Sequence, residues 1–383
     1  MLPAQWQWSN RRQTTISVFR SADSSGRSRV STAVAWPARS VLDRFNASDF
    51  LDIVGLPLLG WERPMNITIL LRSVLAVFAM FVFQLANAAE LELTPTRVSE
   101  HVWFFQGESG MASSKNKGFM SNAGFVVTED QVVVFDALGS VPLGEAMIRA
   151  IGNITRLPIK LVVISHYHAD HFYGLQAFKA LGAEVWAHQN SKSYLSAPVA
   201  QERLAQRRQD LFPWVDESTR LIVPDRTLAA GTRFKRGGID FEIIDVHGSH
   251  ADDDIMLLVK SDEVLFAGDL FFSGRIPFVG DANTGHWLLA LDKMLDSNPR
   301  VVIPGHGNAS SDPRPDMEMT KGYLQYLRAQ MGRAVKNMQT FDEAYDVTDW
   351  SKYQSMPAFD SANRLNAYGV FIDMESSSLS GLE

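Results

Sequence analysis

The chain has 383 residues and a net charge of −7 at pH 7, with 46% apolar and 21% charged residues. This composition is typical of globular proteins and excludes collagen-like, coiled-coil and wholly disordered chains. The absence of cysteine excludes disulfides, thiolate nucleophiles and zinc sites with cysteine ligands. The length indicates two domains, or one large domain with extensions.

The charge is distributed unevenly along the chain. Residues 1–88 contain nine Arg, no Lys and five acidic residues, a net charge of +4, which leaves −11 for the rest. An acidic body of this kind predicts that the protein does not bind nucleic acid.

An unbroken apolar run at 74–83 is too short to span a bilayer and has the length of a signal-peptide core. Arg72 precedes it, and Ala86-Asn87-Ala88 follows with the small-x-small pattern that signal peptidase cleaves. We therefore expect 65–88 to be a signal peptide, and the mature protein to be periplasmic or secreted and to begin at Ala89.

Residues 1–64 precede Met65 and show no sustained strand or helix periodicity. We expect them to be a non-native or disordered extension, explained by a start codon assigned upstream of Met65. An organellar transit peptide followed by a membrane anchor is the alternative, because it is also rich in Arg and Ser.

From Ala89 onward the pattern is α/β. Apolar strands of an antiparallel meander are expected at 101–106, 123–128 and 132–136. They lead into alternating helices and strands at 144–151, 159–165, 175–181 and 184–187. A second half repeats the pattern with strands at 241–246, 255–259 and 264–268, a helix at 287–296 and a strand at 301–304. Two such halves predict a four-layer αβ/βα sandwich.

An amphipathic helix is expected at 319–338, where apolar residues recur four apart. We therefore expect one domain at 89–310 and a helical extension at 311–383 that packs on it and ends in a frayed tail at 376–383.

Metal-binding residue types are concentrated in the segment Ser-His-Tyr-His-Ala-Asp-His, directly after the apolar strand 161–164. His166 and His168 are two apart in an extended segment, so they point the same way and can bind one ion. Asp170 and His171 lie on the following turn and face a second position. Three His and one Asp within six residues predict metal binding.

Three further residues stand at or just beyond the ends of apolar strands. His250 precedes the acidic run 252–254, Asp269 ends the sequence Ala-Gly-Asp, and His306 lies in Pro-Gly-His-Gly. Because α/β folds build sites at the carboxyl ends of strands, we expect these residues to join the first segment in one centre.

With these motifs in place, the chain resembles the metallo-β-lactamase fold superfamily of hydrolases over roughly residues 123–307. The ordered set H-x-H-x-D-H, a lone His, G-D and G-H carries the resemblance. It implies that Asp269 bridges two metal ions and that Asp136 supports the metal loop without being a ligand. The implied ligands of the two ions are His166, His168 and His250 for the first and Asp170, His171 and His306 for the second.

The branch of the superfamily is less sharply defined. The lack of Cys excludes lactamases that need one at the position of Asp269, whereas glyoxalase II-type thioesterases carry Asp there. The segments 274–281 and 363–367 look most like exported metallohydrolases associated with sulfur-oxidation and quinoprotein-dehydrogenase systems. This resemblance implies a periplasmic dehydrogenase system as an associated partner.

The ligand set and the resemblance together predict an exported zinc-dependent hydrolase acting on an ester, thioester or lactam-type bond of a small molecule. A hydroxide bridging two zinc ions would attack the substrate, and Asp170 would orient it. The ligands also accommodate iron or manganese. The alternatives are a β-lactamase-type antibiotic hydrolase, a mononuclear iron dioxygenase acting on persulfides, and a non-catalytic metal-binding accessory of an electron-transfer system.

The remaining histidines have separate interpretations. His101 and His188 lie in or beside strands and are expected to be ordinary, partly buried residues. His247 is not expected to be a ligand, because His250 alone has the small-residue approach and the following acids of the family motif. His286 is expected to face the pocket with Arg275, and helix capping with surface pairing is the alternative.

Overall fold

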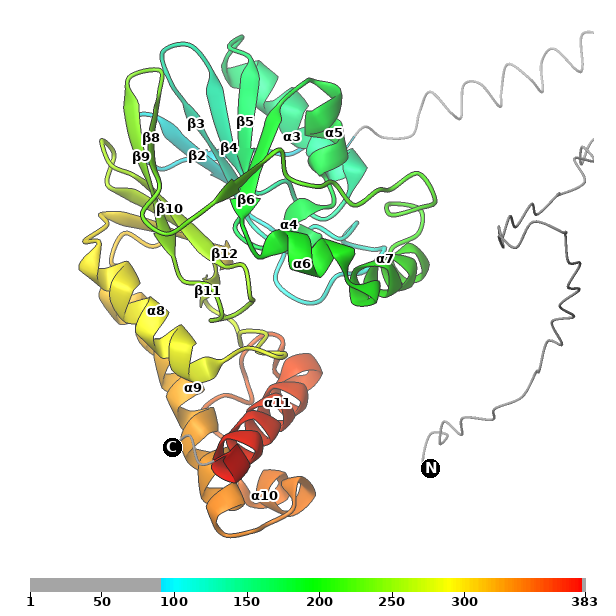
Figure 1. Ribbon diagram of the computed structural model, residues 1–383, viewed down its shortest axis with the longest axis vertical. Helices are drawn as coiled ribbons and strands as arrows, with labels where there is room; N and C mark the ends of the chain where they lie inside the picture. Colours follow the sequence, from blue (N-terminus) through cyan, green and yellow to red (C-terminus); the bar gives the residue numbers. More distant parts are fainter. Residues whose placement is uncertain (1–90, 381–383) are drawn as a thin grey trace, which may run out of the picture. The chain divides into compact units, whose positions relative to one another are not determined.

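The computed structural model describes residues 91–380 (Figure 1), so the predicted signal peptide and residues 1–64 lie outside the described residues. Two β-sheets form the centre of the described part. The first sheet contains, in spatial order, β1 (Thr96–Arg97), β2 (Val102–Phe105), β3 (Ala123–Val127), β4 (Val132–Phe135), β5 (Ile159–Val163), β6 (Glu184–His188) and β7 (Arg226–Leu228). The second contains β12 (Val301–His306), β11 (Val264–Phe272), β10 (Ile255–Val259), β9 (Ile239–Asp245) and β8 (Arg233–Arg236).

The strand directions follow the expected pattern. Strands β1 to β4 pair antiparallel, and β4 to β7 pair parallel, with helices in the connections. In the second sheet β8 to β11 are antiparallel and β12 pairs parallel with β11. The parallel pairs place several strand ends at one edge of the molecule, where the site lies.

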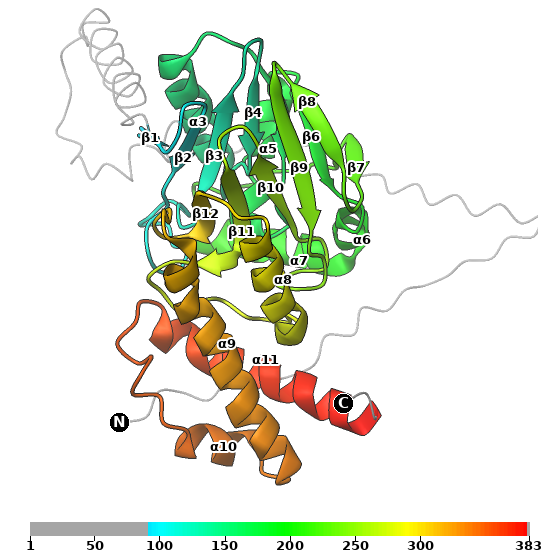
Figure 2. The same cartoon turned by 90° about the vertical axis from the view of Figure 1, so that its left-hand side faces the viewer.

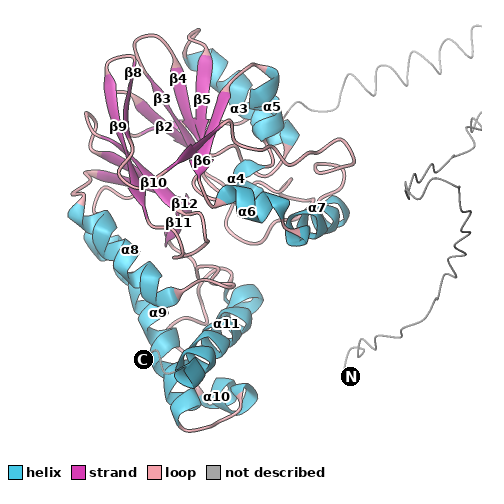
Figure 3. Ribbon diagram, viewed as in Figure 1, coloured by secondary structure: helices cyan, strands magenta, loops and turns pink. Residues whose placement is uncertain are grey.

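Helices cover the outer face of each sheet (Figures 2 and 3). The helices of the first half are α3 (Val141–Ile154), α4 (Ala169–Phe172), α5 (Leu175–Ala180), α6 (Ser191–Ser196) and α7 (Pro198–Asp210). Those of the second half are α8 (Thr284–Asp296), α9 (Pro313–Lys336), α10 (Phe341–Val347) and α11 (Phe359–Ser380). This arrangement confirms the α/β sandwich expected from the sequence, with helices at its C-terminal end.

Successive side chains of a strand point to opposite faces of its sheet, and in these strands both sets are apolar. Each sheet can therefore pack against helices on one face and against the other sheet on the other face. In β4, Val132 and Val134 join the cluster beneath the helices, whereas Val133 and Phe135 join the cluster between the sheets. Between the sheets the rings of Phe135 and Phe266 lie 5.1 Å apart. Strands buried on both faces are what a sheet covered on both sides requires.

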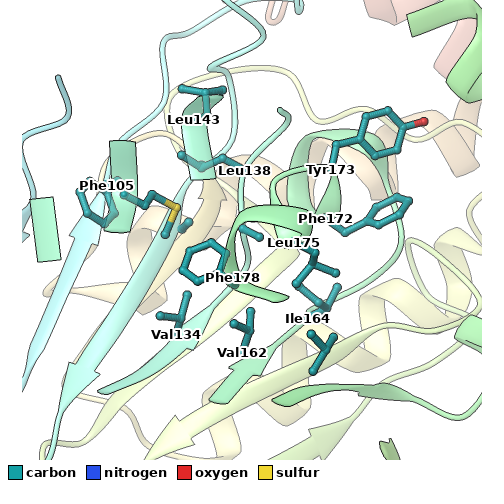
Figure 4. Close-up of a cluster of buried hydrophobic side chains, with 14 of the residues drawn as sticks. Phe105, Val134, Leu138, Leu143, Val162, Ile164, Phe172, Tyr173, Leu175 and Phe178 are labelled. Carbon is teal, nitrogen blue, oxygen red and sulfur yellow. The ribbon is translucent and has the colours of Figure 1, made fainter. Parts of the chain in front are cut away.

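Figure 4 shows the cluster on the outer face of the first sheet. Val134 and Val162 of the sheet face Leu143 of α3 and Leu175 and Phe178 of α5. Burying such side chains contributes roughly 1.5–3 kcal/mol each, so this cluster holds the segment between β5 and α5 firmly against the sheet.

Two expectations about the C-terminal region need correction. The expected helix at 319–338 runs from Pro313 to Lys336, and the expected frayed tail belongs to α11, which continues to Ser380. The helix α11 lies within the helical extension expected at 311–383. Its buried face carries Asn363 and Asn366, whose amides bond Tyr323. Among residues 91–380, no helix has the length and apolarity needed to cross a membrane.

The two glycines of α3 provide a test of how tightly this layer is packed. A Cβ at Gly144 would lie 2.6 Å from the carbonyl oxygen of Gly174, whereas a Cβ at Gly152 would meet nothing within 4 Å. Gly144→Ala should lower the free energy of unfolding by about 1–3 kcal/mol because it overpacks the contact. Gly152→Ala should be neutral or stabilise by up to about 1 kcal/mol, because alanine favours helix. Urea denaturation measures both, and equal stability of the two variants would contradict the packing argument.

Candidate metal centre

The first ligand segment follows β5 and leads into α4. His166 and His168 lie in the extended turn between them, and Asp170 and His171 lie on the first turn of α4. His168 precedes this helix directly, with φ −92° and ψ 145°. The change from extended to helical backbone explains why the two pairs of residues face different positions.

The other three predicted residues come from the second sheet and its loops. His250 lies in the loop between β9 and β10, and His306 is the last residue of β12. Asp269 lies within β11 rather than at the end of a strand at 264–268, because β11 continues to Phe272. The pairing of β11 with β12 shifts register on both sides of Gly268, which has a φ of +54°. This irregularity directs Asp269 into the site.

The structure brings all seven residues together in two groups. Each group offers ligand atoms that lie within 4.8 Å of one another. The first group contains His166, His168, His250 and Asp269, and the second contains Asp170, His171 and His306. Their role as metal ligands remains a prediction.

Asp269 joins the two groups. Its Oδ2 lies 3.4 Å from His250 Nε2 and 3.9 Å from His166 Nε2. Its Oδ1 lies 3.1 Å from His171 Nε2 and 3.3 Å from His306 Nε2. Two ligand atoms bound to one tetrahedral zinc ion at about 2.0–2.1 Å lie about 3.3 Å apart. The oxygen–nitrogen separations around Asp269 therefore suit ligands of a common ion.

The buried polar atoms of this centre fit a bound cation. His166 Nε2, His171 Nε2 and Asp269 Oδ1 are buried and make no hydrogen bond with the described residues. His250 Nε2 and His168 Nδ1 face each other at 3.0 Å. Because buried polar groups without partners are costly, this convergence of nitrogen and carboxylate atoms indicates a site built for metal.

Asp136 controls the tautomers of two of these histidines. Its Oδ2 accepts from His171 Nδ1 at 2.8 Å and from the Ser165 hydroxyl at 2.8 Å. The hydroxyl oxygen of Ser165 also accepts from His166 Nδ1 at 3.0 Å. Both Nδ1 protons are thereby held on the far side of the rings, and Nε2 of both histidines points into the site.

Ser165 is a functional residue that sequence reasoning missed. It stands directly before the first ligand, yet serine is too common at strand ends to be a signal. Asp136 has a φ of +62°, a conformation that aspartate adopts more readily than most residues, and Oδ1 accepts from the Ser165 backbone N–H at 2.7 Å. Asp136 thus contacts His171 and Ser165 directly, and its role in supporting metal ligands stays a prediction.

The loop that precedes β3 supports the other side of the centre. The carbonyl oxygen of Met120 accepts from His306 Nδ1 at 2.7 Å, so Nε2 of this histidine is also free to bind. Ser121 donates to the carbonyl oxygen of Asp170 at 2.5 Å. Asn122 bonds the carbonyls of Pro304 and Gly307 at 2.8 Å each. These residues were not expected to take part.

Burial gives the histidines of the first group low pKa values. It lowers the pKa of His168 to about 3 and that of His250 to about 4. Burial and the neighbouring His171 and His168 lower the pKa of His166 well below its ordinary value. The three imidazoles are therefore neutral at pH 7, which is the form that binds metal.

Charge dominates in the second group. Burial would lower the pKa of His171, but the carboxylates of Asp269, Asp170 and Asp136 raise it well above its ordinary value. Burial would raise the pKa of Asp269, but His306 and His171 hold it well below its ordinary value. The carboxylate of Asp269 is therefore ionised.

Arg275 and His286 occupy different surroundings. Arg275 follows β11 and is buried, whereas His286 is exposed on the first turn of α8. The His286 backbone N–H donates to the capping side chain of Asn283 at 3.0 Å. Among residues 91–380 no hydrogen bond or ion pair joins His286 to Arg275, and their place beside the pocket stays a prediction.

A third cluster contains His188, Asp245 and His247. His247 Nδ1 lies 2.7 Å from Asp245 Oδ1, and His188 Nε2 lies 3.6 Å from Asp245 Oδ2. The Asn190 backbone N–H donates to His188 Nδ1 at 3.2 Å, which leaves the proton of this imidazole on Nε2, facing the carboxylate. In this tautomer a proton occupies the position where a metal ion would bind, which disfavours a metal site at this cluster.

Comparison with known proteins gives consistent relatives. Residues 116–306 match the model of the metallo-beta-lactamase superfamily. A metallo-beta-lactamase type 2 from Bacteroides fragilis is 21% identical over 223 residues, which cover 57% of this chain and 80% of that protein. A linear primary-alkylsulfatase from Pseudomonas sp. (strain ATCC 19151) is 23% identical over 247 residues, which cover 55% of this chain and 47% of that protein.

A solved structure is similar in fold. The stereoselective inverting sec-alkylsulfatase Pisa1 from Pseudomonas sp. aligns with a TM-score of 0.57 at 16% identity, over 73% of this chain and 50% of that one. The chain thus spans about half the length of the alkylsulfatases it matches. Through its matched region, the chain belongs to the metallo-beta-lactamase superfamily, whose members are metal-dependent hydrolases that include lactamases and sulfatases.

Proposed function

We propose that this protein is an exported hydrolase that holds two zinc ions and cleaves an ester, thioester or lactam-type bond of a small molecule. The observation that carries the proposal is the orientation of Asp269, whose two oxygens face two separate groups of histidines. A carboxylate placed in this way suits a pair of cations.

The roles of the side chains follow from their positions. One ion would be held by His166, His168 and His250, and the other ion by Asp170, His171 and His306. Asp269 would be a ligand of both ions. When bound, two such ions supply Lewis acidity and lower the pKa of a coordinated water.

Asp170 is the more accessible of the two central carboxylates. Its side chain is 20% exposed, against 5% for Asp269. We assign it the orientation of the attacking water by hydrogen bonding, in addition to its place among the ligands. The relatives named as lactamases and alkylsulfatases make a lactam and a sulfate ester suitable first assays, beside a thioester.

Export and association rest on sequence features. The run at 74–83 with Ala86-Asn87-Ala88 supports a signal peptide and a periplasmic or secreted protein. The segments 274–281 and 363–367 support association with a periplasmic dehydrogenase system by resemblance.

The metal count is the direct test of the proposal. The purified protein should bind two zinc ions per chain, and Asp269→Ala should weaken both because each ion loses an anionic ligand. His168→Ala should lose metal and activity together. Elemental analysis and zinc titration measure these outcomes. One iron per chain, unchanged in His306→Ala, would favour the mononuclear dioxygenase instead.

His247 supplies the matched control. Its side chain is 55% exposed and pairs with Asp245, so His247→Ala should keep both ions and retain activity within about tenfold. If His247→Ala loses metal while His250→Ala keeps it, the ligand assignment is wrong by three residues.

Asp136→Asn tests the tautomer argument. Asn tolerates the positive φ at this position, but it is uncharged and its single amide oxygen cannot replace both carboxylate oxygens. Zinc affinity should fall by about 10–100-fold at both sites, since Asp136 orients one histidine of each group. Zinc titration measures this affinity. The control is Asp225→Asn, which removes the charge of an exposed carboxylate that pairs with Lys179. Unchanged affinity in Asp136→Asn would refute the argument.

Export is tested by expression from Met65. The protein recovered from the periplasm should begin at Ala89, and Ala88→Glu should block processing because signal peptidase needs a small residue there. N-terminal sequencing measures the start. An exported protein that retains residues 1–64 would overturn the start-site assignment.

A further inference from the structure

The outward nitrogen of His250 has no hydrogen-bond acceptor among residues 91–380. Its Nε2 lies 3.4 Å from Asp269 Oδ2 and 3.0 Å from His168 Nδ1, so Nδ1 is on the side of the ring away from the site. This Nδ1 is buried and makes no hydrogen bond with the described residues. In three other histidines of the centre Nδ1 contacts an oxygen atom, namely in His166, His171 and His306.

The missing acceptor matters once Nε2 binds a cation. An imidazole that binds through Nε2 carries its proton on Nδ1, because the neutral ring has one proton. In His250 this proton would be buried without a nitrogen or oxygen atom to accept it. Because burying a donor without an acceptor is costly, the surroundings of Nδ1 must supply another kind of acceptor.

The indole of Trp287 packs beside this imidazole from the buried face of α8. The two ring centres lie 5.0 Å apart and the planes make an angle of 71°, which is an edge-to-face arrangement. Trp287 is fully buried, and its Nε1 donates to the Leu270 carbonyl at 2.9 Å. Since the indole N–H is already used, Trp287 can offer His250 its electron-rich face, which accepts N–H donors.

Phe272 is a second aromatic neighbour of His250 and fits the role less well. Its ring centre lies 6.2 Å from that of His250, with the planes 59° apart. The ring of Phe272 also stacks on His306, with centres 4.9 Å apart and planes 8° apart. The shorter distance and the steeper angle favour Trp287 as the acceptor.

Trp287 also contacts the strand that carries Asp269. Leu270, whose carbonyl accepts from the indole, is the next residue of β11. The Trp287 backbone N–H donates to the Asn283 carbonyl at 2.9 Å, at the start of α8. One side chain therefore joins α8 to two residues of the first group, directly to His250 and through the following peptide to Asp269.

We propose that Trp287 is a positioning residue of the metal centre: the Nδ1–H of His250 donates to the face of the indole, which fixes the plane of this imidazole. The inference rests on the proposed function and adds a residue that is not itself a ligand to the first group. Because His250 belongs to that group, loss of Trp287 should affect the ion of the first group more than the ion of the second.

Nuclear magnetic resonance tests the proposal on the proton itself. In the zinc-loaded full chain with isotope-labelled histidine, the protons on the ring nitrogens give separate signals. A proton above an indole face is shielded by the ring current, so Nδ1–H of His250 should resonate upfield of the Nδ1–H protons that contact oxygen. Trp287→Leu should abolish this upfield shift, and Trp287→Phe should retain part of it, because phenylalanine keeps an aromatic face. A wild-type His250 signal without the upfield shift overturns the proposal.

Zinc titration measures the consequence for binding. Trp287→Leu should weaken one of the two ions about 10–100-fold, since residues that orient a ligand have effects of this size. Trp287→Phe should weaken it less. Both variants lose the hydrogen bond to the Leu270 carbonyl, so the difference between them reports the aromatic face rather than that bond. Wild-type affinity in Trp287→Leu, or equal weakening in both variants, contradicts the proposal.

Trp186→Leu is the matched control. Trp186 is also buried, but it lies in β6 within the apolar cluster between the sheets. This variant should lose stability while zinc affinity and the shifted resonance stay unchanged. If Trp287→Leu does not fold, the His250 resonance in the wild type and in Trp287→Phe decides the question. Failure of the wild type to hold two zinc ions counts against the proposed function instead.

Discussion

The buried carboxylate of Asp269 is the constraint on which the centre depends. An ionised carboxylate removed from water is unfavourable unless cations or donors compensate it. Asp269 is 4% exposed and lies between two groups of imidazoles. The backbone permits this only because glycine stands opposite, since a Cβ at Gly305 would overlap Asp269 Oδ1. The close approach of β11 and β12 therefore depends on the absence of that side chain.

Local patterns predicted which residues converge at the centre, because their metal-binding side chains and their spacing both appear in the sequence. His166 and His168 are related by the period of an extended segment, and the α/β order of strands brings distant strand ends to one edge. The position of Asp269 within β11 was not predictable, because a register shift depends on pairing with β12. The link from Asp136 through Ser165 to His166 was hidden for the same reason, since tertiary contacts alone give serine this role.

The C-terminal helices show how buried amides obscure a helix in the sequence. Asn363 and Asn366 are both fully buried on α11, where apolar periodicity would be expected. Their amides are satisfied by Tyr323 of α9 and by the loop after β11. Gly369 lets α11 approach this loop closely, because a Cβ there would overlap the carbonyl of Gly280. These helices lie beyond the matched residues 116–306, yet they hold a loop that adjoins the centre.

The two sides of the centre are consequently built by different means. The side of Asp136 and His171 is held by hydrogen bonds between buried groups and by the apolar cluster around α3 and α5. The side of Arg275 combines a loop fixed by α11 with an exposed segment around Gly110. Buried contacts thus hold the predicted ligands on the first side, whereas the second side borders a segment with exposed residues.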